Sequence, residues 1–283
     1  MKIFLAGATG AIGHLLVPLL VNAGHEVAGT TRSAAKRDQI TALGAHPVIM
    51  DALDRDAVFA ALKTEQPDVV IHQLTDLAGR DFAANTRLRI EGTRNLVDAS
   101  LAVDVKRMIA ESIAWIYVPG QEPAREDEAI DVDAPGSRGR AMTAVKSLED
   151  AVAEMPVGIT LRYGILYGPG TWYARDGLTT EQIRRGEIPA NDAVTSFLHV
   201  ADAAQAAFQA LAWPTGALNI VDNEPAPATE WVPLYARLVG APPPPDKPGR
   251  EGWERGTSNT RARQLGWQPL YPSWREGFAK ELT

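Results

Sequence analysis

The chain has 283 residues and a formal net charge of −7, and 45% of its residues are hydrophobic. This length and apolar share predict a single compact α/β body with a substantial core. The acidic balance, without a long run of Lys or Arg, excludes the electrostatic footprint of a nucleic-acid-binding protein. The sequence has no cysteine, which excludes disulfides, thiolate nucleophiles and Cys-ligated metals, and we predict no metal site.

Two further features predict the compartment. Met1 leads straight into an apolar run, which leaves no room for a secretory leader, and no apolar run is long enough to span a bilayer. We therefore expect a cytoplasmic protein without a membrane partner. A small-molecule substrate and a monomeric or homodimeric state are expected as well.

The N-terminal stretch combines the signals of a strand, a tight turn and a helix. An apolar run at 3–6 is followed by glycines at 7, 10 and 13, and an apolar helical pattern begins directly afterwards. Glycines also serve ordinary turns, but this spacing between a strand and a helix is typical of a dinucleotide-binding turn, where a pyrophosphate meets free N–H groups. The predicted cofactor contacts are Gly7, Thr9, Gly10, Ala11, Ile12 and Gly13.

Strand and helix patterns alternate through the next 150 or so residues, as is typical of a parallel, doubly wound sheet. After a first helix at 12–23, strands are predicted at 26–31, 46–50, 69–73, 107–111 and 158–162. Helices are predicted between them at 34–43, 55–63, 82–100 and 140–154. Ligands are expected at the carboxyl ends of the strands.

Beyond Tyr163 the pattern becomes irregular. A strand and an alanine-rich helix are predicted within 195–211, a seventh strand at 217–221 and a helix at 231–238. The proline run at 241–245 favours a stiff loop. Three tryptophans near the C-terminus are expected to pack a small cap: Trp253, Trp267 and Trp274.

Six blocks in the right order resemble the short-chain dehydrogenase/reductase superfamily, in its extended and atypical branches with the epimerase/dehydratase fold. They are GATGAIG at 7–13, VVIHQLT at 69–75, EGTRNLVDAS at 91–100, LRYGILYGPG at 161–170, FLHVADAA at 197–204 and LGWQP at 265–269. The resemblance implies a Rossmann-type fold with a small C-terminal substrate-binding portion. It divides the chain into a dinucleotide-binding domain at 1–165, with its sheet completed by 195–223, and a cap at 166–194 and 224–283.

The end of the second predicted strand bears on cofactor choice. NAD-binding members of such folds place an acid there, whereas here Arg32 follows the strand and could clamp a 2′-phosphate with two donors. NADP is therefore predicted over NAD, although an exposed basic turn is the alternative. Asp51 resembles the residue near the adenine amino group, or it begins a turn or caps the next helix. The resemblance implies further cofactor contacts from Ala52, Leu74, Thr75, Lys146 and Tyr163.

The catalytic positions depart from the family pattern. In the family a Tyr and a Lys four residues later share one helical face, and here Lys146 fits the Lys position while Met142 stands in place of the Tyr. A thioether cannot exchange a proton with a substrate oxygen. The partner hydroxyl position holds Ile113, and Ser112 stands beside it. The alternative for Lys146 is a solvated lysine on an amphipathic helix.

These residues predict an atypical NADP-dependent oxidoreductase or epimerase-like enzyme acting on a small hydroxyl or carbonyl substrate. The proton donor would be Ser112, Tyr117, Tyr173 or an ordered water. The Trp172-Tyr173 pair favours a flat or apolar substrate at least as well as a sugar nucleotide. Alternatively, the pair could equally hold a loop against the core. The rival hypothesis is a non-catalytic NADP-binding sensor or accessory protein. His72 and His199 are predicted to be structural.

Overall fold

A computed structural model of the protein describes residues 1–77 and 81–283. The described chain forms two compact units. The first comprises Met1–Ser112, Val132–Leu161 and Ala204–Ala217, and the second comprises Ile113–Asp131, Arg162–Ala203 and Leu218–Thr283.

Within the described residues the main sheet has seven strands in the order β10-β6-β5-β4-β1-β2-β3. Its strands are β1 (Lys2–Ala6), β2 (Glu26–Thr31), β3 (His46–Ile49), β4 (Val69–His72), β5 (Arg107–Ile113), β6 (Val157–Tyr163) and β10 (Gly216–Ile220). β1 pairs in parallel with both β2 and β4, and β2 with β3 and β4 with β5 are parallel too. The predicted Rossmann-type parallel sheet is therefore confirmed.

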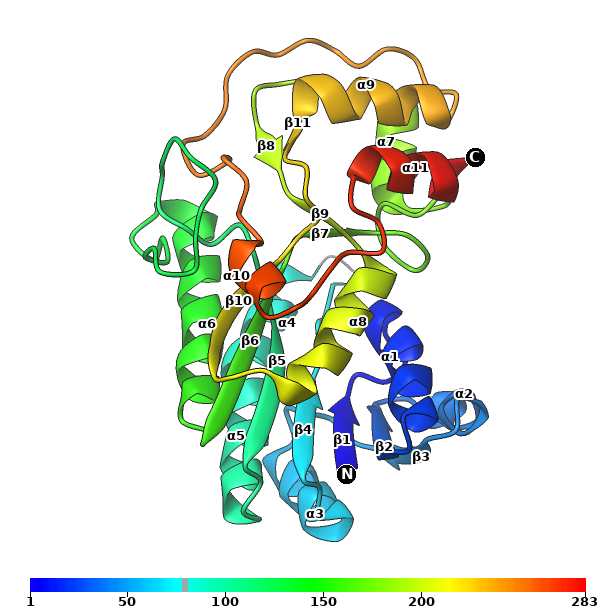
Figure 1. Ribbon diagram of the computed structural model, residues 1–283, viewed down its shortest axis with the longest axis vertical. Coiled ribbons are helices and arrows are strands. Elements are labelled where there is room, and N and C mark those ends of the chain that lie inside the picture. The colour runs from blue at the N-terminus through cyan, green and yellow to red at the C-terminus, as the bar shows by residue number, and fades with distance from the viewer. Residues whose placement is uncertain (78–80) are drawn as a thin grey trace. The chain divides into compact units, whose positions relative to one another are not determined.

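Helices cover both faces of this sheet in the first unit (Figure 1). One face carries α1 (Ala11–Asn22) and α2 (Arg37–Ala42), the latter preceded by the short helix η1 (Ala34–Lys36). The other face carries α3 (Arg55–Glu65), α5 (Thr93–Ala102) and α6 (Gly136–Ala153). Apolar side chains of this second group pack against Phe4, Val70 and Met108 of the sheet. The carboxyl ends of the strands remain the edge at which polar groups collect.

The predicted single helix at 82–100 is interrupted by a wider turn. α4 (Phe82–Arg87) continues into η2 (Leu88–Gly92), which has π-helical hydrogen bonding, and η2 continues into α5. Gly92 lies in this turn, where a Cβ would meet Cδ1 of the Leu88 side chain at 2.7 Å. Such π turns are frequent at functional sites. Here the turn carries the buried Arg89.

Helix α6 begins four residues earlier than the pattern predicts. Its first turn contains two glycines, which have a low helix propensity. The sequence pattern therefore does not predict a helix over this turn. Tertiary packing requires one of them, because a Cβ on Gly139 would lie 2.0 Å from the carbonyl oxygen of Ala134.

The second unit has its own apolar core, which is rich in aromatic rings. The Phe278 ring meets the rings of Tyr167, Phe197 and Tyr235 edge-on, with centroids 4.9 to 5.0 Å apart. Trp267 and Trp274 are fully buried. The unit is built from β7 (Ile165–Tyr167), α7 (Leu178–Arg184), β8 (Val194–Thr195), β9 (Phe197–His199), the start of α8 (Val200–Gln209), β11 (Ala226–Pro227), α9 (Ala228–Leu238), α10 (Thr260–Gln264) and α11 (Trp274–Leu282). The sequence analysis did not predict α7, α10 or α11.

Two buried carboxyl groups accompany this core. Asp222 accepts hydrogen bonds from the backbone N–H groups of Glu224 and Trp274. Burial raises the pKa of Asp222 to about 8 and the pKa of Asp202 to about 6, although backbone donors to each carboxylate act in the opposite direction. The folded protein therefore holds protons on these groups that the unfolded chain releases.

We predict a loss of stability at alkaline pH that depends on Asp222. Between the ordinary pKa of 3.8 and the folded value of about 8, the folded state binds the extra proton, so stability falls as pH rises. Burial lowers the pKa of His72 from 6.5 to about 4, which makes stability rise with pH only below 6.5. Melting temperatures measured from pH 6.5 to about pH 8 follow this fall, to which the raised pKa of buried Glu111 also contributes, so the difference between wild type and variant reports Asp222. Asp222→Asn should flatten the fall, and an equal fall in both proteins would contradict the prediction.

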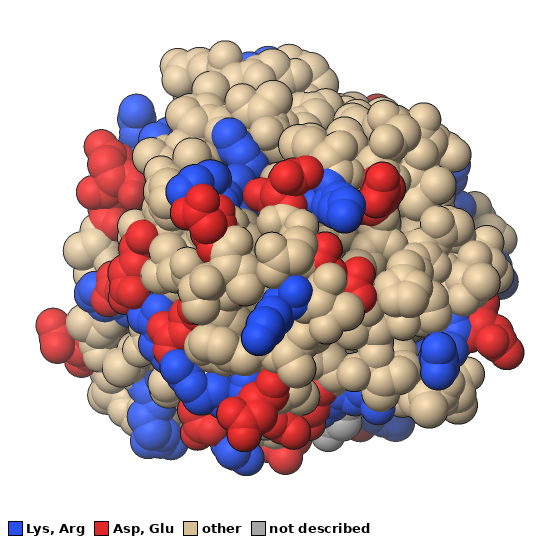
Figure 2. Space-filling model, turned by 90° about the horizontal axis from the view of Figure 1, so that it is seen from below, with Lys and Arg blue, Asp and Glu red and all other residues tan. Residues whose placement is uncertain are grey.

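The face drawn in Figure 2 carries acidic and basic side chains side by side, with no broad patch of one sign. Among the described residues, Arg94 pairs with Glu154 at 2.7 Å and Arg55 with Asp98 at 2.6 Å, so opposite charges are also paired locally. Among residues 1–77 and 81–283, no helix is long and apolar enough to cross a membrane.

Candidate functional site

The glycine turn after β1 leaves no room for side chains at two of its three glycines. A Cβ on Gly13 would lie 2.1 Å from the carbonyl oxygen of Gly7, and a Cβ on Gly7 would lie 2.8 Å from the carbonyl oxygen of Gln73. Gly7 also has a φ of +98°, which L side chains rarely adopt. Its N–H donates to the Thr30 hydroxyl at 3.2 Å, which ties the turn to β2.

Gly10 differs from the other two glycines. It is exposed, its φ is −79°, and a Cβ there would meet only the Gly7 carbonyl oxygen, at 3.4 Å. Gly10 is the N-cap of α1, and no side chain caps this helix. The free N–H groups of the first turn and the bare surface at Gly10 therefore form a cradle that fits a pyrophosphate. Thr9 and Ala11 are half-buried beside it, and Ile12 is buried.

The adenosine side of the turn carries the predicted specificity residues. Arg32, 57% exposed, follows β2, and its guanidinium lies 3.1 Å from the carboxylate of Asp76. Asp51 follows β3, and its carboxylate accepts the N–H of Leu53 at 3.0 Å, so it does form a turn. The N-cap of α3 is Asp54 rather than Asp51. The Arg32 guanidinium is accessible to a phosphate, with Asp76 as the competing anion.

The other predicted cofactor contacts differ in exposure. Ala52 is buried, Leu74 is half-buried and Thr75 is exposed. Leu74 donates its N–H to Nδ1 of His72 at 3.2 Å. Tyr163 on β6 is buried in the second unit, where its hydroxyl lies 3.5 Å from the carbonyl oxygen of Ala203.

The carboxyl end of β5 holds a buried acidic cluster that the sequence analysis missed. The Ser112 hydroxyl donates to the carboxylate of Glu149 on α6 at 2.7 Å. Glu111 lies 3.8 Å from the Arg89 guanidinium. Burial raises the pKa of Glu111 and the nearby Glu149 raises it further, whereas Arg89 lowers it. A charged residue inside the apolar strand RMIAESI was the signal that could have pointed to this cluster.

Among the described residues, Lys146 and Ser112 have different hydrogen-bond partners. Lys146 is 48% exposed and pairs with Asp150 one helical turn later, at 2.7 Å. Met142 is buried. The ribose-binding role predicted for Lys146 therefore stays a prediction, and the group that Ser112 contacts is an acid rather than a lysine.

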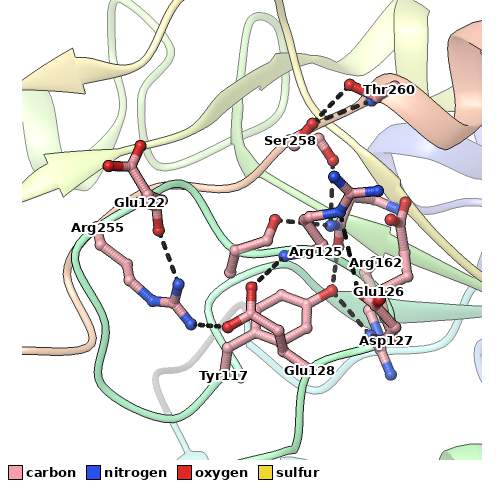
Figure 3. Close-up of polar contacts among 12 residues, drawn as sticks. Tyr117, Glu122, Arg125, Glu126, Asp127, Glu128, Arg162, Arg255, Ser258 and Thr260 are labelled. Atoms are coloured by element: carbon pink, nitrogen blue, oxygen red, sulfur yellow. Dashed lines mark hydrogen bonds and ion pairs between the residues drawn. The ribbon is translucent and has the colours of Figure 1, made fainter.

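Tyr117 and Tyr173, the predicted phenol donors, lie inside the second unit. The Tyr117 hydroxyl donates to Asn219 at 2.5 Å and accepts from Arg162 at 2.8 Å (Figure 3). Burial is the main cause that raises the pKa of each phenol. The Tyr173 ring lies 5.4 Å from that of Phe197, centroid to centroid. Both tyrosines thus have structural surroundings, and their predicted role as proton donors remains a hypothesis.

The two histidines predicted to be structural, His72 and His199, are buried, and each lies close to a polar side chain. His72 Nε2 lies 3.0 Å from the Thr93 hydroxyl, and His199 Nε2 lies 3.3 Å from the carboxylate of Glu281. The Tyr271 ring stacks on His199. Within the described part of the chain, no three His, Asp or Glu side chains gather in a way that could hold a metal ion.

A family model described as the NAD dependent epimerase/dehydratase family matches residues 3–220. The chain belongs to this family. The resemblance inferred from the six sequence blocks is thereby confirmed. A relative from a Streptomyces species, named 3-diazoavenalumate denitrifying reductase, is 44% identical over 99% of this chain and 100% of its own length.

Solved structures of other proteins share the fold. A UDP-glucose 4-epimerase from Thermotoga maritima, with UDP-glucose, is 23% identical and superposes with a TM-score of 0.79 over 100% of this chain and 97% of its own. WbmG from Bordetella bronchiseptica, in complex with NAD and UDP, is 22% identical with a TM-score of 0.80 over 100% of this chain and 94% of its own. Proteins with this fold thus include one that binds the nucleotide cofactor NAD.

Proposed function

We propose that this protein is an NADP(H)-dependent reductase that replaces the diazo group of a flat, conjugated carboxylic acid with hydrogen. The identity to the denitrifying reductase spans almost the whole of both chains, so it includes the strand ends and the loops where substrates bind in such folds. The bound cofactor would supply a hydride. The carbon–nitrogen bond breaks with its electron pair leaving on dinitrogen, a carbon–hydrogen bond forms at the same carbon, and the positive charge of the diazo group passes to the oxidised cofactor.

The observation that carries this proposal is the buried Met142 at the family's phenol position. Reduction of a carbonyl needs an acid to protonate the developing oxyanion, and a thioether is no acid. Replacement of a diazo group by hydride creates no oxyanion, and its products need no proton from the protein. The loss of the phenol therefore suits a denitrifying reduction better than a carbonyl reduction.

The acidic cluster at the end of β5 supports the same chemistry. The Ser112 hydroxyl donates its hydrogen to Glu149. The lone pairs of the Ser112 oxygen therefore remain available to a positively charged group. A carboxylate at this position stabilises positive charge most strongly where water is excluded. We infer that Ser112 and Glu149 face the diazo group while the hydride is delivered.

The predicted preference for NADPH can be tested at Arg32 and Asp76. Arg32→Ala should weaken NADPH binding roughly 10- to 100-fold, since charge-assisted hydrogen bonds to a phosphate contribute roughly 1.5–3 kcal/mol, and should leave NADH binding unchanged. Asp76→Asn should strengthen NADPH binding, because it removes the anion that now lies 3.1 Å from Arg32. Fluorescence titration of both cofactors reports the ratio. An NADPH/NADH ratio that neither variant changes would show that Arg32 is not the phosphate clamp.

The proposed activity is tested with an aromatic diazo carboxylic acid labelled with ¹⁵N in the diazo group. Purified protein and NADPH should release labelled dinitrogen, detected by mass spectrometry, faster than NADPH alone. With NADPH deuterated at nicotinamide C4, the product should carry one deuterium at the carbon that lost nitrogen. Deuterium from the solvent at that carbon would contradict direct hydride delivery.

Met142→Leu serves as the matched variant for this test. It conserves volume at a buried position and removes the sulfur, so the rate should stay nearly unchanged. A panel of ketones and aldehydes provides the competing substrates. Robust ketone reduction without dinitrogen release would overturn the proposed substrate class, and cofactor binding without any turnover would favour the sensor hypothesis.

A further inference from the structure

The side chain of Gln73 is a buried amide without a hydrogen-bond partner. Gln73 follows β4 directly and is 8% exposed, and neither its Oε1 nor its Nε2 has a partner. A buried amide left unpaired costs roughly 1–3 kcal/mol, so native proteins rarely keep one without a reason. Its backbone is well fixed, because its N–H donates to the carbonyl oxygen of Ala6 at 2.9 Å. The unsatisfied amide thus sits on a rigid strand end.

The position of Gln73 relates it to one half of a dinucleotide. The glycine turn follows β1, while Arg32 and Asp51 follow β2 and β3 on the adenosine side. β4 lies on the opposite side of β1, and the carbonyl oxygen of Gln73 would be 2.8 Å from a Cβ on Gly7. In such folds the dinucleotide crosses the turn from one side of the sheet to the other. Gln73 therefore lies on the nicotinamide side.

Other unused hydrogen-bonding atoms occur at the same edge of the sheet. Glu111 is one residue beyond Ala110, which pairs with His72 across β4 and β5, just as Gln73 is one residue beyond His72. Oε1 of Glu111 and Nε of Arg89 are buried and face each other as an ion pair at 3.8 Å, and neither atom makes a hydrogen bond within the described chain. Gln73 and Glu111 thus stand at adjacent strand ends, with Arg89 of η2 facing Glu111, and the Gln73 amide is the group that lacks any partner among the described residues. This arrangement indicates a place where a polar ligand group completes the network.

We propose that the Gln73 amide binds the carboxamide of the nicotinamide ring and so fixes the rotation of that ring. A primary carboxamide offers one acceptor and one donor group, which match the donor and acceptor of Gln73 and satisfy both atoms at once. A carboxylate or a phosphate would satisfy Nε2 alone and leave Oε1 unpaired. This inference rests on the nicotinamide cofactor of the proposed function and is independent of the diazo substrate.

The test compares three ligands of the wild type and of Gln73→Leu by calorimetry: NADPH, its 3-acetylpyridine analogue, and 2′-phospho-ADP-ribose. The analogue replaces the carboxamide by a methyl ketone, and the last compound lacks the ring. Gln73→Leu should bind NADPH about tenfold more weakly, as expected for two neutral hydrogen bonds. It should bind 2′-phospho-ADP-ribose as the wild type does. The wild type should favour NADPH over the analogue, and the variant should lose this preference.

Gln39→Leu, a change at an exposed glutamine on α2, is the matched control and should alter none of these affinities. Thermal unfolding without ligand should show Gln73→Leu at least as stable as the wild type, because an unpaired amide is removed. Unchanged NADPH binding by Gln73→Leu would overturn the inference, and so would an equal loss for all three ligands. A wild type that binds neither NADPH nor NADH would instead refute the cofactor of the proposed function.

Discussion

Gly10→Val is expected to abolish cofactor binding while the protein still folds. The backbone at Gly10 has a φ of −79° and a ψ of 172°, which a β-branched residue adopts readily, and a Cβ there meets only the Gly7 carbonyl oxygen at the ordinary distance of 3.4 Å. The added methyl groups would nevertheless occupy the surface over the N-terminus of α1. We expect NADPH affinity to fall by at least about 100-fold, which corresponds to roughly 2.7 kcal/mol.

Thermal unfolding with and without NADPH measures both quantities, since a ligand that binds only the folded state raises the melting temperature. The wild type should show a cofactor-induced shift, and Gly10→Val should show none while its unliganded melting temperature stays close to that of the wild type. Gly13→Ala is the contrasting variant, because its Cβ would lie 2.1 Å from the Gly7 carbonyl oxygen and should destabilise the free protein as well. A shift retained in Gly10→Val would mean that the pyrophosphate binds elsewhere.

Arg255→Ala is expected to destabilise the second unit more than any surface charge change. The Arg255 side chain is 4% exposed, pairs with Glu128 at 2.6 Å, and donates to the carbonyl oxygens of Glu122 at 2.7 Å and Val118 at 3.0 Å (Figure 3). One guanidinium thus holds a loop that lies more than a hundred residues earlier in the sequence. A Cβ on Gly120 would lie 2.5 Å from this guanidinium, so the loop is shaped around it.

Removal of one partner of a buried ion pair typically costs about 3–5 kcal/mol, because it leaves the other groups unpaired. Since the Glu128 side chain is 33% exposed, the lower end of this range is expected for Arg255→Ala. Arg255→Lys should recover only part of this loss, since a single ammonium cannot serve three acceptors in the geometry of a planar fork. Urea denaturation followed by tryptophan fluorescence gives the free energies of unfolding. Arg275→Ala is the matched control, because Arg275 is 42% exposed and its pairs with Glu224 and Glu230 lie at the surface, where about 1 kcal/mol or less is expected. Equal losses for both variants would contradict the role of Arg255.

The features that the sequence determined by itself are local in the chain. The glycine turn, the alternation of strands and helices, and the family follow from spacings of a few residues, because backbone conformation and apolar periodicity are read over such distances. The structural character predicted for His72 and His199 also agrees with their burial. In contrast, the short helices α7, α10 and α11 lack a long periodic pattern and were missed.

Only the tertiary structure decided which side chains meet. Ser112 and Glu149 are 37 residues apart, and Arg32 and Asp76 are 44 apart, so no local pattern pairs them. Lys146 has the helical spacing that places it near a buried Met142, yet its ammonium turns to Asp150 at the surface. The orphaned amide of Gln73 is likewise invisible in the sequence, because burial without a partner is a property of all the elements that surround a side chain. Sequence spacing therefore identifies the strand ends where a ligand site is expected, and packing between distant elements selects the groups that face one another there.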